Sequence, residues 1–266
     1  MATFRWSDLS WTELEERRKD NPVVLFPVGA TEMHGLHLPL GNDFFNAQGF
    51  AERAAEKTSS LVLPVIPFGY SEFLRSFAGT ISIRHETLSM MVEDVVRCVL
   101  GYGFDHILFV NPHIDNVAII EAAARRVKAD TGIAMALVNP TALAKALAAD
   151  LFDVPANKVG GHGGIIGTSV MLALKPELVD LSKARRGEMK QVWGMQAISP
   201  SEVKFGKGNV HLFLEAGDVN DAGTWGEPQH VTPEKAEIVG QRVTDYIAEF
   251  IEHFRSIDTR SKSRAL

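Results

Sequence analysis

The stretch from Val23 to Asp43 reads VVLFPVGATEMHGLHLPLGND. Its first part, residues 23–28, is almost entirely apolar and is followed by Gly29, which is typical of a short buried strand that ends in a turn. The second part carries the polar side chains Glu32, His34, His37 and Asp43. The stretch therefore predicts a buried strand whose carboxyl end leads into a loop rich in metal-binding residue types.

The same alternation of apolar runs and amphipathic stretches continues along the chain. Helical periodicity is expected in residues 45–57, 86–100, 116–130, 168–174 and 233–254, and further strands in 61–66, 107–110 and 133–138. Strands that alternate with helices favour an α/β domain with a mainly parallel central sheet. Right-handed crossovers then place helices on both faces of that sheet.

Residues 183–230 interrupt this rhythm. They are rich in glycine, charge and turn formers, and we expect a hairpin within 203–214. Long excursions of this kind serve as lids or interfaces, and the apolar residues Trp193, Phe205, Leu212 and Phe213 fit either role. We therefore expect one domain over 1–254, with 183–230 as a lid or interface and 255–266 as a flexible tail.

Composition excludes several classes of protein. The 266 residues are 45% hydrophobic and 23% charged, which is typical of a globular domain. The net charge of −6 argues against a nucleic-acid or membrane-surface binder. No stretch is long and apolar enough to span a membrane, and the first residues lack a signal-peptide core. One cysteine, Cys98, permits no intrachain disulfide and is expected to be buried, and we expect a cytoplasmic protein.

Two segments that follow predicted strands carry candidate metal ligands. Glu32, His34 and Asp43 follow the first strand, and His113 and Asp115 follow the strand at 107–110. Carboxylates mixed with imidazoles suit Zn²⁺ or Mn²⁺, and Fe²⁺ also fits. If the two strands are neighbours, these side chains are enough for two metals and one bridging carboxylate. The alternative is a loop of solvated polar residues, with Asp115 as a helix cap.

A third segment, residues 160–164, places His162 between glycines ahead of a predicted helix. We expect His162 to carry a proton in catalysis, because histidine titrates near neutral pH. The alternative is a phosphate-binding loop. No Gly-x-Ser-x-Gly elbow is present, so a serine nucleophile has no support. His37 is interpreted as a residue that orients a metal ligand, and the other histidines as surface or structural residues.

These motifs resemble those of the creatininase (creatinine amidohydrolase) family. Residues 27–43 resemble the family's opening motif, Pro-x-Gly-(Ser/Ala)-x-Glu-(Gln)-His-Gly-x-His-Leu-Pro-x-x-(Thr)-Asp. Residues 77–81, 111–116, 161–169 and 223–228 resemble further family motifs, the last being Gly-x-x-Gly-Asp-Pro. The resemblance covers about residues 10–245.

The resemblance implies a three-layer α/β/α sandwich, assembled as a homo-oligomer, often a hexamer, with two divalent metal ions, Zn or Mn. It implies that Glu32 and His113 hold one ion, that His34 and Asp115 hold the other, and that Asp43 bridges them. His162 would lie in the pocket as a proton donor or acceptor.

Four positions depart from the family pattern. Gly167 stands where the family has a glutamate, Leu74 where it has a histidine, Asn42 where it has a threonine, and Asp115 where it has a glutamate. Aspartate still binds metals, so these departures concern the substrate more than the metal site.

We therefore expect a hydrolase in which a metal-bound hydroxide attacks the carbonyl of a small cyclic substrate. His162 and Asp115 are the expected proton carriers, and a cyclic amide C–N bond is the first choice. One alternative is hydrolysis of a C–C bond in an oxidised inositol or another cyclic diketone. Another is a non-catalytic small-molecule-binding protein on the same scaffold.

Overall fold

The computed structural model describes residues 3–155, 158–199 and 201–260. Its main sheet has the strand order β2-β1-β3-β4, and every neighbouring pair is parallel. The strands are β1 (Val24–Pro27), β2 (Leu61–Val62), β3 (Ile107–Val110) and β4 (Ala136–Val138).

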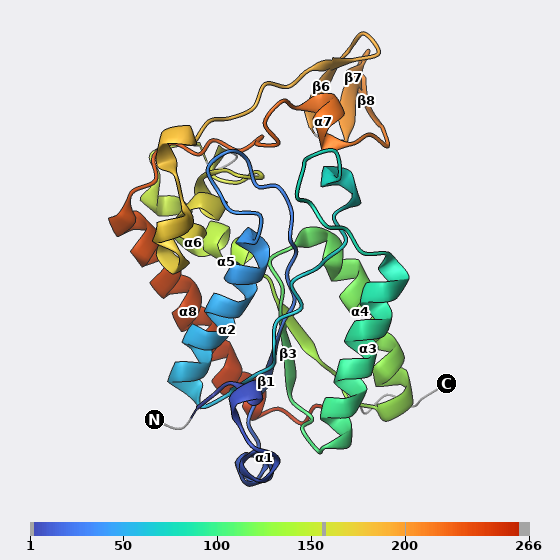
Figure 1. The fold of residues 1–266 in the computed structure, drawn as a ribbon, viewed down its shortest axis with the longest axis vertical. Helices are drawn as coiled ribbons and strands as arrows, with labels where there is room; N and C mark the ends of the chain where they lie inside the picture. Colours follow the sequence, from blue (N-terminus) through green and yellow to red (C-terminus); the bar gives the residue numbers. More distant parts are fainter. Residues whose placement is uncertain (1–2, 156–157, 200, 261–266) are drawn as a thin grey trace.

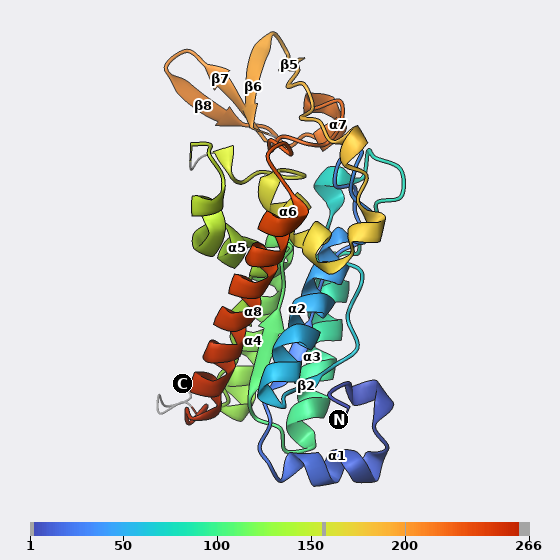
Figure 2. The ribbon, with the colours of Figure 1, turned by 90° about the vertical axis from the view of Figure 1, so that its left-hand side faces the viewer.

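Helices cover both faces of this sheet, so the α/β fold is confirmed (Figures 1 and 2). One face carries α2 (Asn42–Thr58), α5 (Pro140–Ala148), α6 (Ile165–Leu174) and α8 (Pro233–Arg255). The other face carries α3 (His85–Gly101) and α4 (Ile114–Thr131). The helix α1 (Trp11–Arg18) lies across one end of the molecule (Figure 2). Short 3₁₀ helices complete the list: η1 (Trp6–Asp8), η2 (Glu72–Leu74), η3 (Ala149–Leu151), η5 (Pro176–Leu178) and η6 (Leu181–Lys183).

The sheet has an apolar core on each face, because successive side chains of a strand point to opposite faces. Leu25 and Leu108 pack with α2, α6 and α8, whereas the next residues, Phe26 and Phe109, pack with α3 and α4. Because both faces are covered, β1 and β3 are buried along their whole length and consist of apolar residues. The apolar run at 23–28 is therefore the expected sequence of a central parallel strand.

The predicted elements are found with shifted ends. The helix expected at 45–57 begins at Asn42 and so includes Asp43 in its first turn. The strand expected at 61–66 pairs as a ladder only at Leu61–Val62, because Pro64 has no N–H to donate. Two helices, α1 and α5, were missed; their sequence signals are the capping box of Ser10 and the cap of Asn139 ahead of Pro140.

The prediction that Cys98 is buried is wrong, because Cys98 is exposed. The buried stripe of α3 runs through Leu88, Val92, Val96 and Val99, at helical spacing. Position 98 follows Val96 by two residues, which turns its side chain to the opposite side of the helix.

Residues 183–230 form a second, antiparallel sheet with the order β5-β6-β7-β8, which projects from the body (Figures 1 and 2). Its strands are β5 (Gln191–Val192), β6 (Met195–Ser199), β7 (Glu202–Phe205) and β8 (Gly208–His211). The hairpin expected in this segment is the β7–β8 pair. The short helix α7 (Ala216–Val219) follows it and leads back to the body.

The end of the chain is less solvated than expected. Thr259 is buried, its carbonyl accepts a hydrogen bond from Ala134 N at 2.8 Å, and Arg260 pairs with Ile133. Residues 261–266 of the expected tail lie outside the described residues. Among the described helices, none is both long and apolar enough to cross a membrane.

The strand order creates a switch point between β1 and β3. From β1 the chain passes through α2 to β2 on one side, and then through α3 to β3 on the other side of β1. The loops after β1 and β3 therefore leave the sheet next to each other and in opposite directions. In open α/β sheets, such a point forms the crevice in which ligands bind.

A buried asparagine of α4 ties the chain segments at this crevice together. Asn116 Nδ2 donates to Gly29 O at 2.9 Å and to Asn111 Oδ1 at 3.2 Å, and its Oδ1 accepts from Tyr70 N at 3.0 Å. Asn116 is fully buried. If its amide were removed, the groups that bond to it would lose their hydrogen-bond partner, and bulk water could not replace it. The asparagine thus joins the ends of β1 and β3 to the loop after β2.

We expect Asn116→Ala to lower the free energy of unfolding by about 2–4 kcal/mol, because it leaves several buried backbone groups without partners. Denaturant unfolding, followed by circular dichroism, measures the change. The matched control is Asn209→Ala on the exposed strand β8, for which a change within about 0.5 kcal/mol is expected. Equal stability of the two variants would contradict this role of Asn116.

Candidate functional site

The candidate metal ligands come from different elements but meet at the switch point. Glu32 and His34 lie in the loop after β1, and Asp43 lies in the first turn of α2. His113 is the N-cap of α4, directly after β3. His162 comes from the glycine-rich loop that precedes α6. Because β1 and β3 are hydrogen-bonded neighbours, side chains far apart in the sequence share one crevice.

The loop after β1 is held by backbone hydrogen bonds on both sides of Glu32. Thr31 O accepts from Ile81 N at 2.9 Å, and Glu32 N donates to Leu40 O at 2.8 Å. Met33 N donates to Thr80 Oγ1 at 3.1 Å. These contacts fix the backbone of the loop and direct Glu32 and His34 into the crevice.

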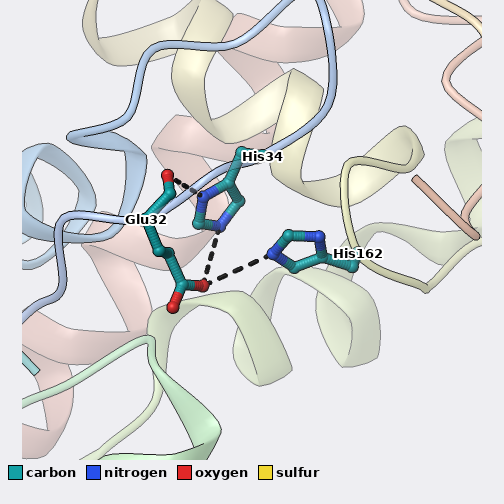
Figure 3. Close-up of side chains that lie close together, drawn as sticks. All are labelled: Glu32, His34 and His162. Atoms are coloured by element: carbon teal, nitrogen blue, oxygen red, sulfur yellow. Dashed lines mark hydrogen bonds and ion pairs between the residues drawn. The ribbon is translucent and has the colours of Figure 1, made fainter. Parts of the chain in front are cut away.

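The side chains form one cluster around the two carboxylates. Asp43 Oδ2 lies 3.0 Å from His113 Nδ1, and Asp43 Oδ1 lies 3.2 Å from His34 Nε2. Glu32 Oε1 lies 3.4 Å from His113 Nδ1, 3.4 Å from His162 Nε2 and 3.7 Å from His34 Nε2. In Figure 3 the Glu32 carboxylate faces both His34 and His162. Glu32 is 1% exposed, so this cluster is shielded from bulk water.

Each of the three imidazoles donates one ring N–H to a backbone carbonyl. His113 Nε2 donates to Tyr70 O at 2.7 Å, His162 Nδ1 to Gly223 O at 2.8 Å, and His34 Nδ1 to Glu32 O at 3.3 Å. A carbonyl oxygen can only accept, so these nitrogens carry the protons of the neutral rings. The other nitrogen of each ring then presents a lone pair to the carboxylates.

Lone pairs of imidazoles and carboxylates cannot face one another at these distances without a positive charge between them. Either the histidines are protonated, or a metal cation is bound. Glu32 Oε2 is buried and has no hydrogen-bond partner among the described residues, which leaves it free as a ligand. The donor set, imidazole nitrogen with carboxylate oxygen, fits Zn²⁺ and Mn²⁺.

When protons on the histidines supply the balancing charge, the histidines and carboxylates of the cluster shift one another's pKa values. Burial alone would lower the pKa of His113, but the negative charge of Glu32 and Asp43 outweighs burial and raises it well above its ordinary value. His34 is shifted in the same direction, with Asp43 as the main opposing charge. Burial would raise the pKa of Asp43, yet the positive histidines lower it well below its ordinary value. A metal ion would replace these protons, so its affinity falls as the pH is lowered.

Within the part of the chain that the structure describes, two groups of side chains could hold a metal ion. One consists of Glu32, Asp43 and His113, and the other of Glu32, His34 and His162. The two oxygens of Asp43 face different histidines, His34 and His113. His162, which the sequence analysis interprets as a proton carrier, is therefore also close enough to act as a ligand.

Asp115 lies at the edge of this site. It stands in the first turn of α4 and is exposed, and it belongs to neither of the two groups. Partial desolvation raises its pKa above the ordinary value, while the charge of His113 opposes this shift and the charge of Glu32 adds to it, so Asp115 lies in the electrostatic field of the cluster. Its role as a metal ligand or proton carrier remains a prediction.

His37 does not contact the candidate ligands directly. It is buried, and its Nε2 lies 2.9 Å from Thr168 Oγ1 at the start of α6. Burial, reinforced by the charge of His34, lowers the pKa of His37 to about 4, so its ring is neutral at pH 7. Its contact joins the loop after β1 to α6, whereas orientation of a ligand remains a prediction.

Several residues of the site were missed by the sequence analysis. The carbonyls of Tyr70 and Gly223 fix two histidine tautomers, but a backbone carbonyl leaves no mark in the sequence. The Trp225 ring stacks on His162, with centroids 4.7 Å apart and an angle of 21° between the planes. The motif at 223–228 was recognised, but nothing in the sequence placed it against His162.

Two of the positions that depart from the family pattern, Leu74 and Gly167, have different surroundings in the structure. Leu74 is 4% exposed and packs with Met33 and Ala216 in a small apolar cluster, so it is a core residue here. Gly167, in α6, has open space where a Cβ would stand. A side chain at position 167 would therefore find room, and its absence leaves space beside the first turn of α6.

Comparisons with known proteins agree with this site. The model of the family described as "Creatininase: Creatinine amidohydrolase" matches residues 7–251. A creatinine amidohydrolase of Pseudomonas putida is 31% identical over 193 residues, covering 66% of this chain and 74% of the relative. A mycofactocin precursor peptide peptidase of Mycobacterium tuberculosis is 29% identical over 216 residues, covering 77% and 76%. A 3-dehydro-scyllo-inosose hydrolase of Thermotoga maritima is 29% identical over 106 residues, covering 40% and 34%.

Solved structures show the same fold over nearly the whole chain. A structure titled "Creatininase Mn" has a TM-score of 0.79 and 25% identity, covering 96% of this chain and 100% of that one. A creatininase variant described as "Zn-Zn type" has a TM-score of 0.76 and 25% identity, covering 97% and 100%. With a family match from residue 7 to residue 251 and a buried cluster suited to divalent metals, the chain belongs to the creatininase family of metal-dependent hydrolases.

Proposed function

We propose that this protein hydrolyses a C–N bond of a small cyclic amide. The observation that carries the proposal is the inward direction of three imidazole nitrogens toward two buried carboxylates, a set of donors that fits divalent metal ions at the switch point. Two of the three relatives above are named as an amidohydrolase and a peptide peptidase. Both names concern amide bonds, which favours this bond type.

We assign the metal ligands as follows. Glu32 and His113 would hold one ion, His34 and Asp115 would hold the other, and Asp43 would be a ligand of both. Bound divalent ions lower the pKa of water and polarise a carbonyl group, so no serine or cysteine nucleophile is needed. The short contacts of Glu32, Asp43, His34 and His113 support four of these assignments, and Asp115 rests on the family motif.

His162 supplies the proton transfer. Its Nδ1–H is held by Gly223 O, so Nε2 is the nitrogen that can accept a proton and later return it to the leaving amine. Nε2 points to Glu32 Oε1, and the side chain is 15% exposed, more than the other site histidines. It therefore lies between the cluster and the solvent, where a substrate enters.

The chief alternative is hydrolysis of a C–C bond in a cyclic ketone. One relative is named an inosose hydrolase, but the match covers only 34% of that protein. The apolar cluster that contains Trp225, which stacks on His162, also holds the aromatic rings of Phe73 and Phe77. A planar amide ring fits such surfaces better than a polyol does.

Metal analysis tests the ligand assignment. We expect about two transition-metal ions per chain in the wild type and a loss of most of this metal in Asp43→Asn, which removes the bridging charge. The control is Asp94→Asn on the exposed face of α3, which should keep the wild-type metal content. One ion in the wild type would contradict a two-metal site. No metal after incubation with Zn²⁺ and Mn²⁺ would contradict metal dependence.

A substrate panel tests the reaction. Zinc- and manganese-loaded enzyme is assayed with creatinine, hydantoin, a short peptide and a keto-inositol, and we expect turnover of at least one cyclic amide. His162→Ala should keep its metal and lose about 10²–10⁴-fold in kcat, the usual contribution of a general acid–base residue. Turnover of the keto-inositol alone would favour the C–C alternative. Loss of metal from His162→Ala would instead assign His162 as a ligand.

The second sheet is proposed as a contact between subunits. Trp193 is 76% exposed, Phe205 66% and Phe213 97%, whereas Leu212 packs against the small core of this sheet. Exposed aromatic side chains on one projecting element are typical of an interface. A homo-oligomer, a hexamer in the family pattern, would cover them.

Analytical ultracentrifugation tests this surface. We expect an oligomer for the wild type and smaller species for Phe213→Asp, because a charge cannot be buried in an apolar contact. The control is Tyr102→Asp at the C-terminal end of α3, another exposed aromatic residue (61%), which should leave the assembly unchanged. A monomeric wild type would rule out the interface and favour a lid.

A further inference from the structure

The segment Gly223–Gly226 contacts His162 in three different ways. Gly223 O accepts the Nδ1–H of His162 at 2.8 Å, and Gly226 N donates to His162 O at 3.1 Å. Between them, the Trp225 ring stacks on the imidazole. One short segment thus holds the backbone, one ring nitrogen and one ring face of the same residue.

The approach of Gly223 to the site depends on its lack of a side chain. Gly223 has φ +64, and a Cβ there would lie 1.8 Å from Met33 Cε and 2.2 Å from Met33 Sδ. Met33 stands between Glu32 and His34 in the loop that carries the candidate ligands. Glycine therefore lets the carbonyl that fixes the tautomer of His162 pack directly against that loop.

Trp225 is braced on one side and open on another. The Phe73 ring meets it edge-on with centroids 5.9 Å apart, and both belong to the apolar cluster around Met33 and Leu74. A cavity of about 300 Å³ also adjoins Trp225, with Lys158, Arg186 and Glu227 among its lining residues. Trp225 therefore contacts His162 and also lines this cavity, so it is not enclosed in a core.

The segment is itself anchored by buried polar contacts. Asn220 Oδ1 accepts from Ala222 N at 3.0 Å and from Thr224 N at 3.2 Å, and Asn220 is fully buried. Thr224 O accepts from Gly187 N at 2.6 Å. The segment can therefore hold His162 in place rather than follow its motion.

We propose that the segment Gly223–Gly226 positions His162, with Gly223 setting its tautomer and Trp225 setting the plane of its ring. This inference rests on the proposed role of His162 in proton transfer. A histidine free to rotate would present Nε2 to the substrate only part of the time. The stacked Trp225 removes that freedom through its contact with His162, which is itself a member of one of the two candidate metal groups.

The test follows the Nδ1–H proton of His162 by NMR in zinc-loaded, ¹⁵N-histidine-labelled protein. The signal is assigned by its absence from His162→Ala. In Trp225→Leu, which keeps an apolar side chain but loses the flat ring, we expect the exchange of this proton with water to rise by about tenfold, the loss expected for one aromatic pair. Trp225→Phe should restore slow exchange, because phenylalanine also stacks.

Two controls separate positioning from general damage. Trp11→Leu, at an exposed tryptophan of α1, should leave the signal unchanged, and metal content should stay constant in all Trp225 variants. Exchange as slow in Trp225→Leu as in the wild type would overturn the proposal, as would fast exchange in Trp225→Phe. The signal reports Nδ1 and needs no substrate, so the result stands apart from whether Nε2 transfers a proton or binds metal.

Discussion

The burial of two carboxylates against three imidazoles is the constraint on which the rest of the site depends. Glu32 and Asp43 lie in a crevice where an unpaired charge would be costly, so their charge must be balanced in place. Backbone carbonyls hold the outer nitrogen of each histidine, which leaves only the inner nitrogens for that task. Protons or divalent metal ions can supply the balancing charge, because the inner histidine nitrogens can bind either.

The strand order delivers these groups to one point. Because β1 lies between β2 and β3, the loops after β1 and β3 diverge and leave a crevice at their carboxyl ends. Asn116 ties that crevice together, and α2 begins early enough to carry Asp43 in its first turn. The glycine-rich loop before α6 then brings His162 over the cluster, where the segment 223–226 holds it.

Much of this could be read from the sequence, and the failures have physical reasons. The apolar runs at 23–28 and 107–110 predicted the buried strands well. A parallel strand that is covered on both faces is apolar along its whole length, so it stands out as a continuous apolar run. Cys98 was expected to be buried because it is a small apolar residue in an apolar helix, whereas only the stripe through Leu88, Val92, Val96 and Val99 is buried in α3. The strand expected at 133–138 is shorter in the structure, where β4 begins at Ala136. Ile133 pairs instead with Arg260, near the distant end of the chain.

By itself, the sequence determined the fold class, the family and the residue types of the metal site, because these follow from local periodicity and from motifs of fixed spacing. Only the tertiary structure decided which side chains meet. It brought His162 as close to Glu32 as His113 is, left Asp115 exposed at the edge, and placed Trp225 on His162. Such contacts join segments more than 60 residues apart and involve backbone carbonyls, which carry no signature in the order of amino acids.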